Sequence, residues 1–214
     1  MKTNRPIKKT GFTLIELLTV IAIMAILAAF IMPITRAVSV SKIRNRARTE
    51  MSNLETAIET YKAKLGYYPP ADPNQPASNP LYFELLGTTM TNATTYTTLD
   101  GSASIAANVV NSTFGVGGFL NCTRPGGGDD TLAATAFLGG LKPAQYSEIA
   151  PGVRILIGPA APGTLTTNAW CYRSSSPAHN PKTFDLWIDI TIAGKINRIC
   201  NWSDQALIGN GTYP

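Results

Sequence analysis

Histidine, cysteine and charged residues are scarce in this chain of 214 residues. It has one histidine and three cysteines, and charged side chains make up 14% of it. His179 lies in a loop between two prolines, where a solvated side chain is far more common than a catalytic base. No Gly-x-Ser-x-Gly, His-Glu-x-x-His or phosphate-loop pattern is present. The residues give no support to catalysis, and we expect the protein not to be an enzyme.

The three cysteines, Cys122, Cys171 and Cys200, have no spacing that is typical of a zinc site. In an oxidising compartment one pair of thiols can form a disulfide. Cys171 and Cys200 lie in expected strands, and they are the pair that we predict. The alternative is that all three are small buried apolar side chains.

A long apolar run near the N-terminus is the dominant feature that is present. Residues 14–34 contain one charged side chain, Glu16. At 1.5 Å per helical residue, a run of this length is enough to span an apolar bilayer core of about 30 Å. A carboxylate in such a run is costly unless it is paired, so Glu16 is a candidate functional residue.

Basic residues precede the hexapeptide Gly-Phe-Thr-Leu-Ile-Glu at 11–16, and Pro33 lies near the end of the apolar run. This pattern resembles the class III leader of type IV pilin-like proteins, a family that includes type IV pilins and the pseudopilins of type II secretion. The resemblance implies that a prepilin peptidase cuts between Gly11 and Phe12 and methylates the amine of Phe12. It also implies that Glu16 pairs with the N-terminal amine of a neighbouring subunit, and that Glu16 and Pro33 act in assembly and register.

A secretory signal peptide or a plain membrane anchor is the alternative interpretation of the same segment. A signal peptide is cut after its apolar region, behind small residues, and Ala28-Ala29 offers only a weak site. A plain anchor explains the length of the run but not Glu16.

The resemblance to the pilin-like family further implies a bacterial inner-membrane protein that crosses the membrane once, with its C-terminal domain outside the cytoplasm.

The net charge of +5 does not indicate a nucleic-acid partner. Residues 1–11 carry four basic side chains and no acidic one, whereas residues 49–214 carry nine basic and twelve acidic side chains. The basic excess therefore flanks the apolar run, as is typical of segments beside a membrane. We expect the protein to contact a membrane and no nucleic acid.

The helical pattern continues beyond the apolar run. From Val40 to Leu65, apolar residues recur every three or four positions, which predicts a helix with one buried face. Arg44 and other charged residues are expected on the opposite face, and Gly66 is a natural stop. We therefore predict one helix of about 80 Å over residues 12–65.

The chain is predicted to consist of four parts. They are a cleaved leader (1–11), a transmembrane and assembly helix (12–35), its amphipathic continuation (36–65) and a globular head with looped insertion (66–214).

The clearest strand signal is late in the chain. Residues 184–192 alternate between apolar and polar, Ala193-Gly194 provides a two-residue turn, and residues 195–200 return as a second strand. The apolar faces of this hairpin and of the helix can be buried against each other. We predict an α+β, pilin-like fold, with a long N-terminal helix packed on a small antiparallel sheet. Further helices are expected near 81–86, 131–138 and 144–149, and strands near 153–157 and 169–173.

Two short tracts, Tyr67-Tyr68-Pro69 and Asp185-Leu186-Trp187, resemble the major pseudopilin of type II secretion. Major pseudopilins carry an acidic calcium loop after the second tract, where this chain has a hairpin with one carboxylate. Asp189 and Asp204 are candidate ligands for Ca²⁺. The sequence does not define the full set of oxygen ligands that a calcium site needs.

The resemblance implies a structural subunit that assembles with itself, into a homopolymer or a mixed filament, through its N-terminal helix. Its other partners would be the prepilin peptidase and an inner-membrane assembly platform, and the filament would be periplasmic or on the cell surface. The major pseudopilin is the function that we favour. The alternatives are a subunit of a surface type IV pilus and a membrane-anchored extracellular binding domain, with residues 70–183 as its recognition surface.

Overall fold

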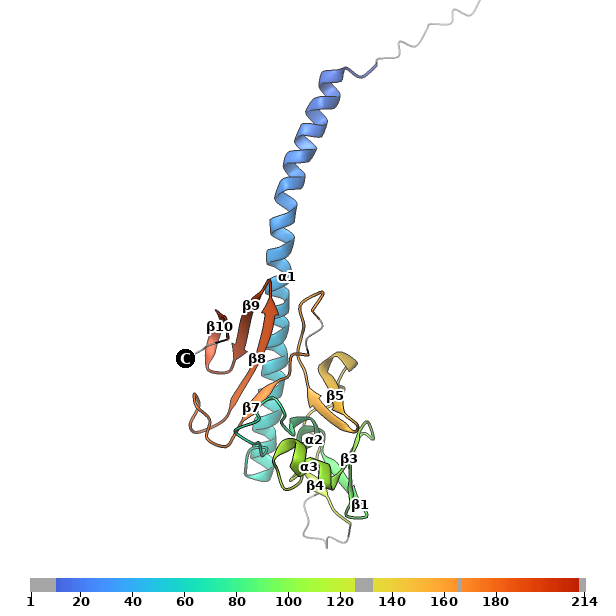
Figure 1. Ribbon diagram of the computed structural model, residues 1–214, viewed down its shortest axis with the longest axis vertical. Helices are drawn as coiled ribbons and strands as arrows, with labels where there is room; N and C mark the ends of the chain where they lie inside the picture. The colour runs from blue at the N-terminus through green and yellow to red at the C-terminus, as the bar shows by residue number, and fades with distance from the viewer. Residues whose placement is uncertain (1–10, 126–132, 165–166, 212–214) are drawn as a thin grey trace, which may run out of the picture. The chain divides into compact units, whose positions relative to one another are not determined.

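The computed structural model describes residues 11–125, 133–164 and 167–211, and within these ranges it leaves the side chains of 29–37 undescribed. The chain divides into two compact units, residues 1–41 and 42–214. One helix, α1 (Leu14–Leu65), contributes to both (Figure 1). The structure combines this helix with mainly antiparallel sheets, so the predicted α+β class is confirmed.

In the first unit, the described residues form a non-helical segment at 11–13 and the N-terminal part of α1. The helix begins at Leu14, two residues after the predicted start. The membrane span expected over residues 14–34 is not confirmed, because no helix among the described residues is both long and apolar enough to cross a membrane.

In the second unit, the remainder of α1 buries the stripe that the periodicity predicts. The buried apolar residues on this part of the helix are Ala47, Met51, Leu54, Ala57, Ile58 and Tyr61. Arg44, expected on the solvent side, is instead half-buried and donates from Nε to Oδ1 of Asn197 at 3.1 Å. The helix ends as predicted, because Gly66 has a φ of 89° and its N–H donates to the Lys62 carbonyl at 2.8 Å.

An antiparallel sheet in the order β10-β9-β8-β7 lies beside this part of α1 (Figure 1). Its strands are β7 (Cys171–Arg173), β8 (Asp185–Ile192), β9 (Lys195–Cys200) and β10 (Ser203–Gly209). Leu186, Ile188 and Ile190 are completely buried, as the alternation predicts. Ala193 and Gly194 have φ values of 50° and 77°, which suit the turn of a tight hairpin. The predicted hairpin is therefore confirmed, whereas β10 was not predicted.

A second four-stranded sheet, in the order β3-β2-β1-β4, was not predicted from the sequence. Its strands are β1 (Thr88–Thr91), β2 (Thr95–Thr98), β3 (Ser104–Ala106) and β4 (Cys122–Thr123). Two short helices, α2 (Leu81–Leu86) and α3 (Ala107–Phe114), precede and follow β1–β3. Helix α2 was predicted. The strands were missed because β1 and β2 are rich in threonine, which was read as loop, and because β3 and β4 have only three and two residues.

The predicted helix at 144–149 is wrong. That segment is a short 3₁₀ turn, η1 (Pro143–Gln145), followed by β5 (Tyr146–Ala150), which pairs with the predicted strand β6 (Val153–Leu156). The predicted helix at 131–138 is also wrong over its described residues, 133–138. There the N–H groups of Thr135 and Phe137 donate to Asn121 and Leu85 in place of helical carbonyls.

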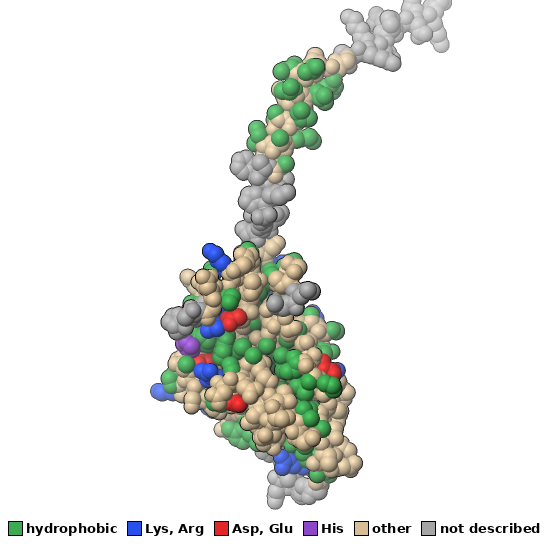
Figure 2. All heavy atoms as spheres, in the orientation of Figure 1, with side chains coloured by type: hydrophobic (Ala, Val, Ile, Leu, Met, Phe, Trp, Pro, Cys, Tyr) green, Lys and Arg blue, Asp and Glu red, His purple; other side chains and the backbone are tan. Residues whose placement is uncertain are grey.

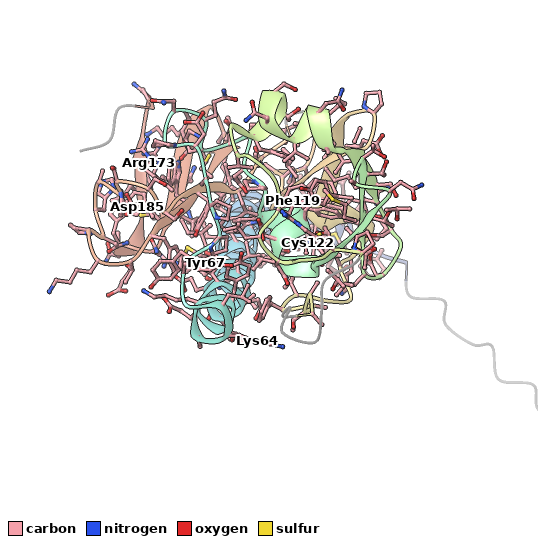
Figure 3. The ribbon with its side chains drawn as sticks, turned by 90° about the horizontal axis from the view of Figure 1, so that it is seen from below. Lys64, Tyr67, Phe119, Cys122, Arg173 and Asp185 are labelled. Atoms are coloured by element: carbon pink, nitrogen blue, oxygen red, sulfur yellow. The ribbon has the colours of Figure 1, made fainter. Side chains whose placement is uncertain are left out.

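A buried carboxylate joins α1 to the second sheet. Glu84 on α2 has no exposed surface and accepts hydrogen bonds from the Tyr61 hydroxyl at 2.9 Å and from the N–H groups of Leu120 and Asn121 at 2.8 and 2.9 Å. Figure 3 views the second unit from below, with Asp185 on the side of the β7–β10 sheet and Phe119 on the other side of α1. The core thus lies on two sides of α1.

Candidate functional site

The candidate site is the start of α1, where Thr13 and Glu16 form a reciprocal cap. Thr13 immediately precedes the helix, and Glu16 is its third residue. The Thr13 hydroxyl accepts a hydrogen bond from the Glu16 N–H at 3.3 Å, and Glu16 Oε2 accepts bonds from the N–H and hydroxyl of Thr13 at 2.8 and 2.6 Å. This capping box satisfies backbone donors that the first turn of a helix otherwise leaves unpaired.

The cap gives Glu16 a partner within its own chain. From the sequence we expected this carboxylate to need the amine of a neighbouring subunit, and the structure of one chain leaves that expectation untested. The role of Thr13 was missed, although the signal was visible: a threonine followed three residues later by a glutamate, just before an apolar run, predicts a capping box.

The expected cleavage site lies just before this cap. Gly11 and Phe12 are exposed and belong to the non-helical segment at 11–13. A side chain added at Gly11 would meet no other atom within 4 Å. The Gly11–Phe12 peptide bond is therefore accessible to another protein and is not tied into the hydrogen bonds of the helix.

Apolar side chains cover the described part of the first unit after this bond (Figure 2). From Phe12 to Leu27 eleven large apolar side chains are exposed, from 46% for Val20 to 82% for Phe12. Apolar surface of this extent indicates a site that another molecule covers. Pro33, expected to act in assembly, lies in the stretch 29–37, where the backbone is helical but the side chains are outside the described residues.

The predicted Cys171–Cys200 disulfide is not formed, because all three cysteines are free. Cys171 on β7 and Cys200 on β9 both pair with Trp187 on β8, so a whole strand separates them. Two strand spacings put their Cα atoms about 10 Å apart, beyond the limit of about 7 Å for a disulfide.

Burial raises the pKa of the Cys171 thiol to about 12 and also raises the pKa of the Cys200 thiol.

The calcium candidates do not fit a calcium site. Both carboxylate oxygens of Asp189 accept hydrogen bonds from Arg198, from Nε and Nη2, each at 2.8 Å. Asp204 is exposed on β10. Calcium prefers six to eight oxygen ligands, with several carboxylates among them. Over the described ranges of the chain, no cluster of three or more His, Cys, Asp or Glu residues is placed to hold a metal.

The Asp-Leu-Trp tract has a structural role that the sequence did not reveal. The Asp185 carboxylate is buried and accepts hydrogen bonds from the N–H groups of Ala178, His179 and Asn180 at 2.7 to 3.0 Å. The His179 ring stacks on Trp202, with 3.9 Å between ring centres. The histidine is thus part of a loop that is organised by Asp185.

Comparison with known proteins points to the same N-terminal segment. A family model described as the prokaryotic N-terminal methylation motif matches residues 7–32. The type II secretion system core protein G of Vibrio cholerae serotype O1 is 37% identical over 65 residues, which cover 30% of this chain and 44% of that protein. The fimbrial protein EcpB of Eikenella corrodens is 37% identical over 115 residues, which cover 50% of this chain and 70% of that protein. No solved structure matches the chain.

Proposed function

The chain belongs to the type IV pilin-like proteins, and from this premise we propose that it is a structural subunit of a filament that assembles through α1. The observation that carries the proposal is the exposed apolar surface from Phe12 to Leu27, directly after a leader of the methylation type. Packing of this surface against copies of the same helix would replace the lipid contacts of the anchored subunit and would keep the apolar area away from water in the assembled filament.

Processing is the second part of the proposal. A prepilin peptidase would cut the exposed Gly11–Phe12 bond and methylate the new amine of Phe12. Before assembly the chain would be held in the bacterial inner membrane, with its C-terminal domain outside the cytoplasm and with an assembly platform as its partner. The leader match supports this order of events. No catalytic activity is assigned, and the names of the two relatives describe a secretion-system core protein and a fimbrial protein.

Within this family we favour the major pseudopilin of a type II secretion system. The support is the match to a core protein G, together with the tracts Tyr67-Tyr68-Pro69 and Asp185-Leu186-Trp187. A surface pilus subunit is the second candidate, because the aligned segment covers 70% of the fimbrial relative but less than half of the secretion relative. Long fibres on intact cells at native expression would favour the pilus.

Mass spectrometry of the mature N-terminus tests the proposal. We expect the isolated protein to begin at Phe12. Its mass should be that of residues 12–214 plus one methyl group. Gly11→Val should leave a precursor that retains residues 1–11, since a branched side chain replaces the glycine before the cut. Gly117→Val, the same change at an exposed loop glycine with no atom within 4 Å, should be processed normally. Native protein that still begins at Met1 would overturn the proposal.

A further inference from the structure

Five cationic side chains lie together in the second unit, around the beginning of its part of α1. Lys42, Arg44, Arg46 and Arg48 alternate with uncharged residues on the helix, and no acidic residue lies between them. Lys195 begins β9, directly after the turn of the β8–β9 hairpin. We call these five residues the basic collar. All of them belong to the second unit, so the collar is separate from the exposed apolar surface of the first unit.

The hairpin turn lies beside α1 (Figure 1), and a buried amide joins the two. Asn197, which is 1% exposed, accepts a hydrogen bond at Oδ1 from Arg44 Nε at 3.1 Å. The same side chain donates from Nδ2 to the Lys195 carbonyl at 3.0 Å. The partner of Arg44 is thus a neutral amide, which holds the guanidinium group in place but does not compensate its charge.

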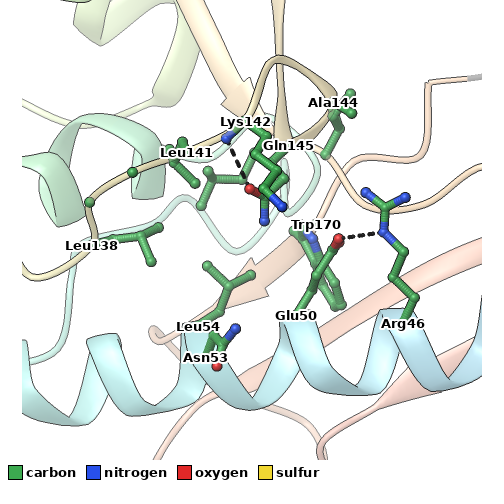
Figure 4. A pocket seen from close by; sticks show the side chains of 14 residues that line it. Arg46, Glu50, Asn53, Leu54, Leu138, Leu141, Lys142, Ala144, Gln145 and Trp170 are labelled. Atoms are coloured by element: carbon green, nitrogen blue, oxygen red, sulfur yellow. Dashed lines mark hydrogen bonds and ion pairs between the residues drawn. The ribbon is translucent and has the colours of Figure 1, made fainter.

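Among the described residues, one acidic side chain forms an ion pair with the collar. Arg46 Nε donates to Glu50 Oε1 at 2.9 Å, at the edge of a cavity (Figure 4). Lys42 and Lys195 are exposed. Their side chains and that of Arg48 make no hydrogen bond or ion pair within the part of the chain that the structure describes. Like charges this close repel one another, so the collar favours an anionic partner.

A second copy of the chain offers few unpaired acidic groups for this role. Residues 49–214 carry twelve acidic side chains, of which those at 129 and 130 lie outside the described residues. Of the others, all but Glu55 and Asp204 already accept a hydrogen bond or form an ion pair within their own chain. The acidic groups of a neighbouring subunit are therefore a poor match for the collar.

The place of the collar in the sequence points to a membrane instead. Lys42 follows the end of the apolar run, Ile34, by eight positions. In the proposed orientation the second unit lies outside the cytoplasm, whereas an excess of Lys and Arg beside a membrane is typical of the cytoplasmic side. Cations on the other side call for an anion there, and the phosphate groups of anionic lipids provide one.

We propose that the basic collar binds the phosphate groups of anionic phospholipids at the outer surface of the membrane, before the subunit assembles. The inference rests on the proposed function, which holds the chain in a membrane at that stage. Each Lys or Arg close to an anionic lipid surface adds to the attraction, and dissolved salt screens it. The collar thus selects anionic over zwitterionic lipid around the subunit.

Phosphatidylglycerol titrated into the full chain in dodecylphosphocholine micelles tests the proposal, with the backbone amide signals of residues 42–48 and 195 as the NMR readout. Phosphatidylcholine, which has no net charge, and inorganic phosphate, which is not a lipid, are the parallel probes. We expect saturable shifts with phosphatidylglycerol and none with either of the other two at the same concentration. Sodium chloride at about 0.5 M should reverse most of the shift.

Lys42→Gln/Lys195→Gln should weaken the apparent affinity for phosphatidylglycerol by about tenfold or more, because it removes two exposed charges of the collar. Lys64→Gln/Lys182→Gln is the matched control, since it removes two exposed lysines that lie outside the collar. Circular dichroism verifies that both double variants fold. Unchanged affinity in the folded collar variant, or equal shifts with phosphatidylcholine or inorganic phosphate, would overturn the proposal.

Two further outcomes separate this inference from the proposed function. A chain that inserts into micelles but shows no shift with phosphatidylglycerol contradicts the lipid site alone, and it would assign the collar to the acidic groups of another copy. Native protein that is absent from the membrane fraction of cells before assembly contradicts the proposed membrane stage itself.

Discussion

At the scale of single residues, Glu84 is a completely buried carboxyl group that links the stability of the fold to pH. Burial raises the pKa of its carboxyl above the ordinary value of 4.5, and the hydrogen bonds from Asn121, Leu120 and Tyr61 oppose this shift only in part. The folded chain therefore holds this proton at a higher pH than the unfolded chain. The resulting contribution to the free energy of unfolding is present below the ordinary pKa and is lost as pH rises through the folded pKa.

Glu84→Gln should lower the free energy of unfolding by about 1–3 kcal/mol, because it sets an NH₂ group against donors that now bond a carboxylate. Urea unfolding of the full chain in micelles, followed by circular dichroism, measures the change. Glu59→Gln, at an exposed position whose partner is the Tyr68 hydroxyl, should cost far less.

The pH dependence provides a second test of the same residue. The stability difference between the parent and Glu84→Gln should shrink as pH rises from below 4.5 toward neutrality, since only the parent loses this contribution. A difference that stays constant, or that grows with pH, would contradict a raised pKa of Glu84.

At this scale, contacts between near neighbours in sequence can be predicted, whereas contacts between distant residues cannot. Thr13 and Glu16 are three positions apart, so their mutual cap can be predicted from sequence alone. Glu84 lies in a short apolar segment, and two of its three partners are 36 and 37 positions away. Such a distance leaves no local pattern, and the role of Glu84 emerged only from the fold.

At the scale of elements, the β8–β9 hairpin and the segment before β7 meet at a close contact. A methyl group added at Gly158 would overlap Ile188 Cδ1 on β8 and would lie 3.1 Å from Trp170 Nε1. Ile188 is completely buried, and Trp170 is 2% exposed. Glycine at position 158 thus allows this segment to approach the sheet.

Gly158→Ala should lower the free energy of unfolding by about 1–3 kcal/mol, because the packed core has no room for the methyl group. Ile188→Val removes Cδ1, so the double variant should recover part of that loss in a double-mutant cycle of urea denaturations. Gly117→Ala is the control, since its methyl group would meet nothing within 4 Å. Strict additivity of the two changes would show that this contact does not explain the glycine.

The elements that sequence predicted well are those with a long or strict period. The helix stripe and the alternation in β8 repeat over many residues, and each implies one buried face. The strands β1–β4 are two to four residues long, and β1 and β2 are rich in threonine. Their pairing with one another, including the parallel pair of β1 and β4, determines them more than their own composition does.

At the scale of the whole molecule, the proposed assembly through α1 gives Glu16 a second role once the apolar surface at 12–27 is covered. In the single chain the carboxylate accepts hydrogen bonds from Thr13. Glutamate and glutamine both serve at this position of a capping box, but only glutamate carries charge. The observed cap and the proposed ion pair of Glu16 can therefore be separated by substitution.

Glu16→Ala and Glu16→Gln should both be cut before Phe12 and should both fail to form filaments of normal length, because neither can pair with an N-terminal amine in the apolar core. Mass spectrometry reports the cut, and electron microscopy of isolated filaments reports assembly. Glu59→Ala, at an exposed carboxylate further along α1, is the control and should assemble normally. Normal filaments from Glu16→Gln would show that the cap alone, not the charge, is required.

The sequence by itself determined the N-terminal methylation motif, the long helix ending at Leu65, the late hairpin and the α+β class. Each follows from residues that are neighbours along the chain or that repeat with a helical or strand period. Only the tertiary structure decided that β8 separates Cys171 from Cys200, that Arg198 holds both oxygens of Asp189 and that Glu84 joins three distant segments. Those outcomes depend on strand order and on partners far away in sequence, which no local pattern specifies.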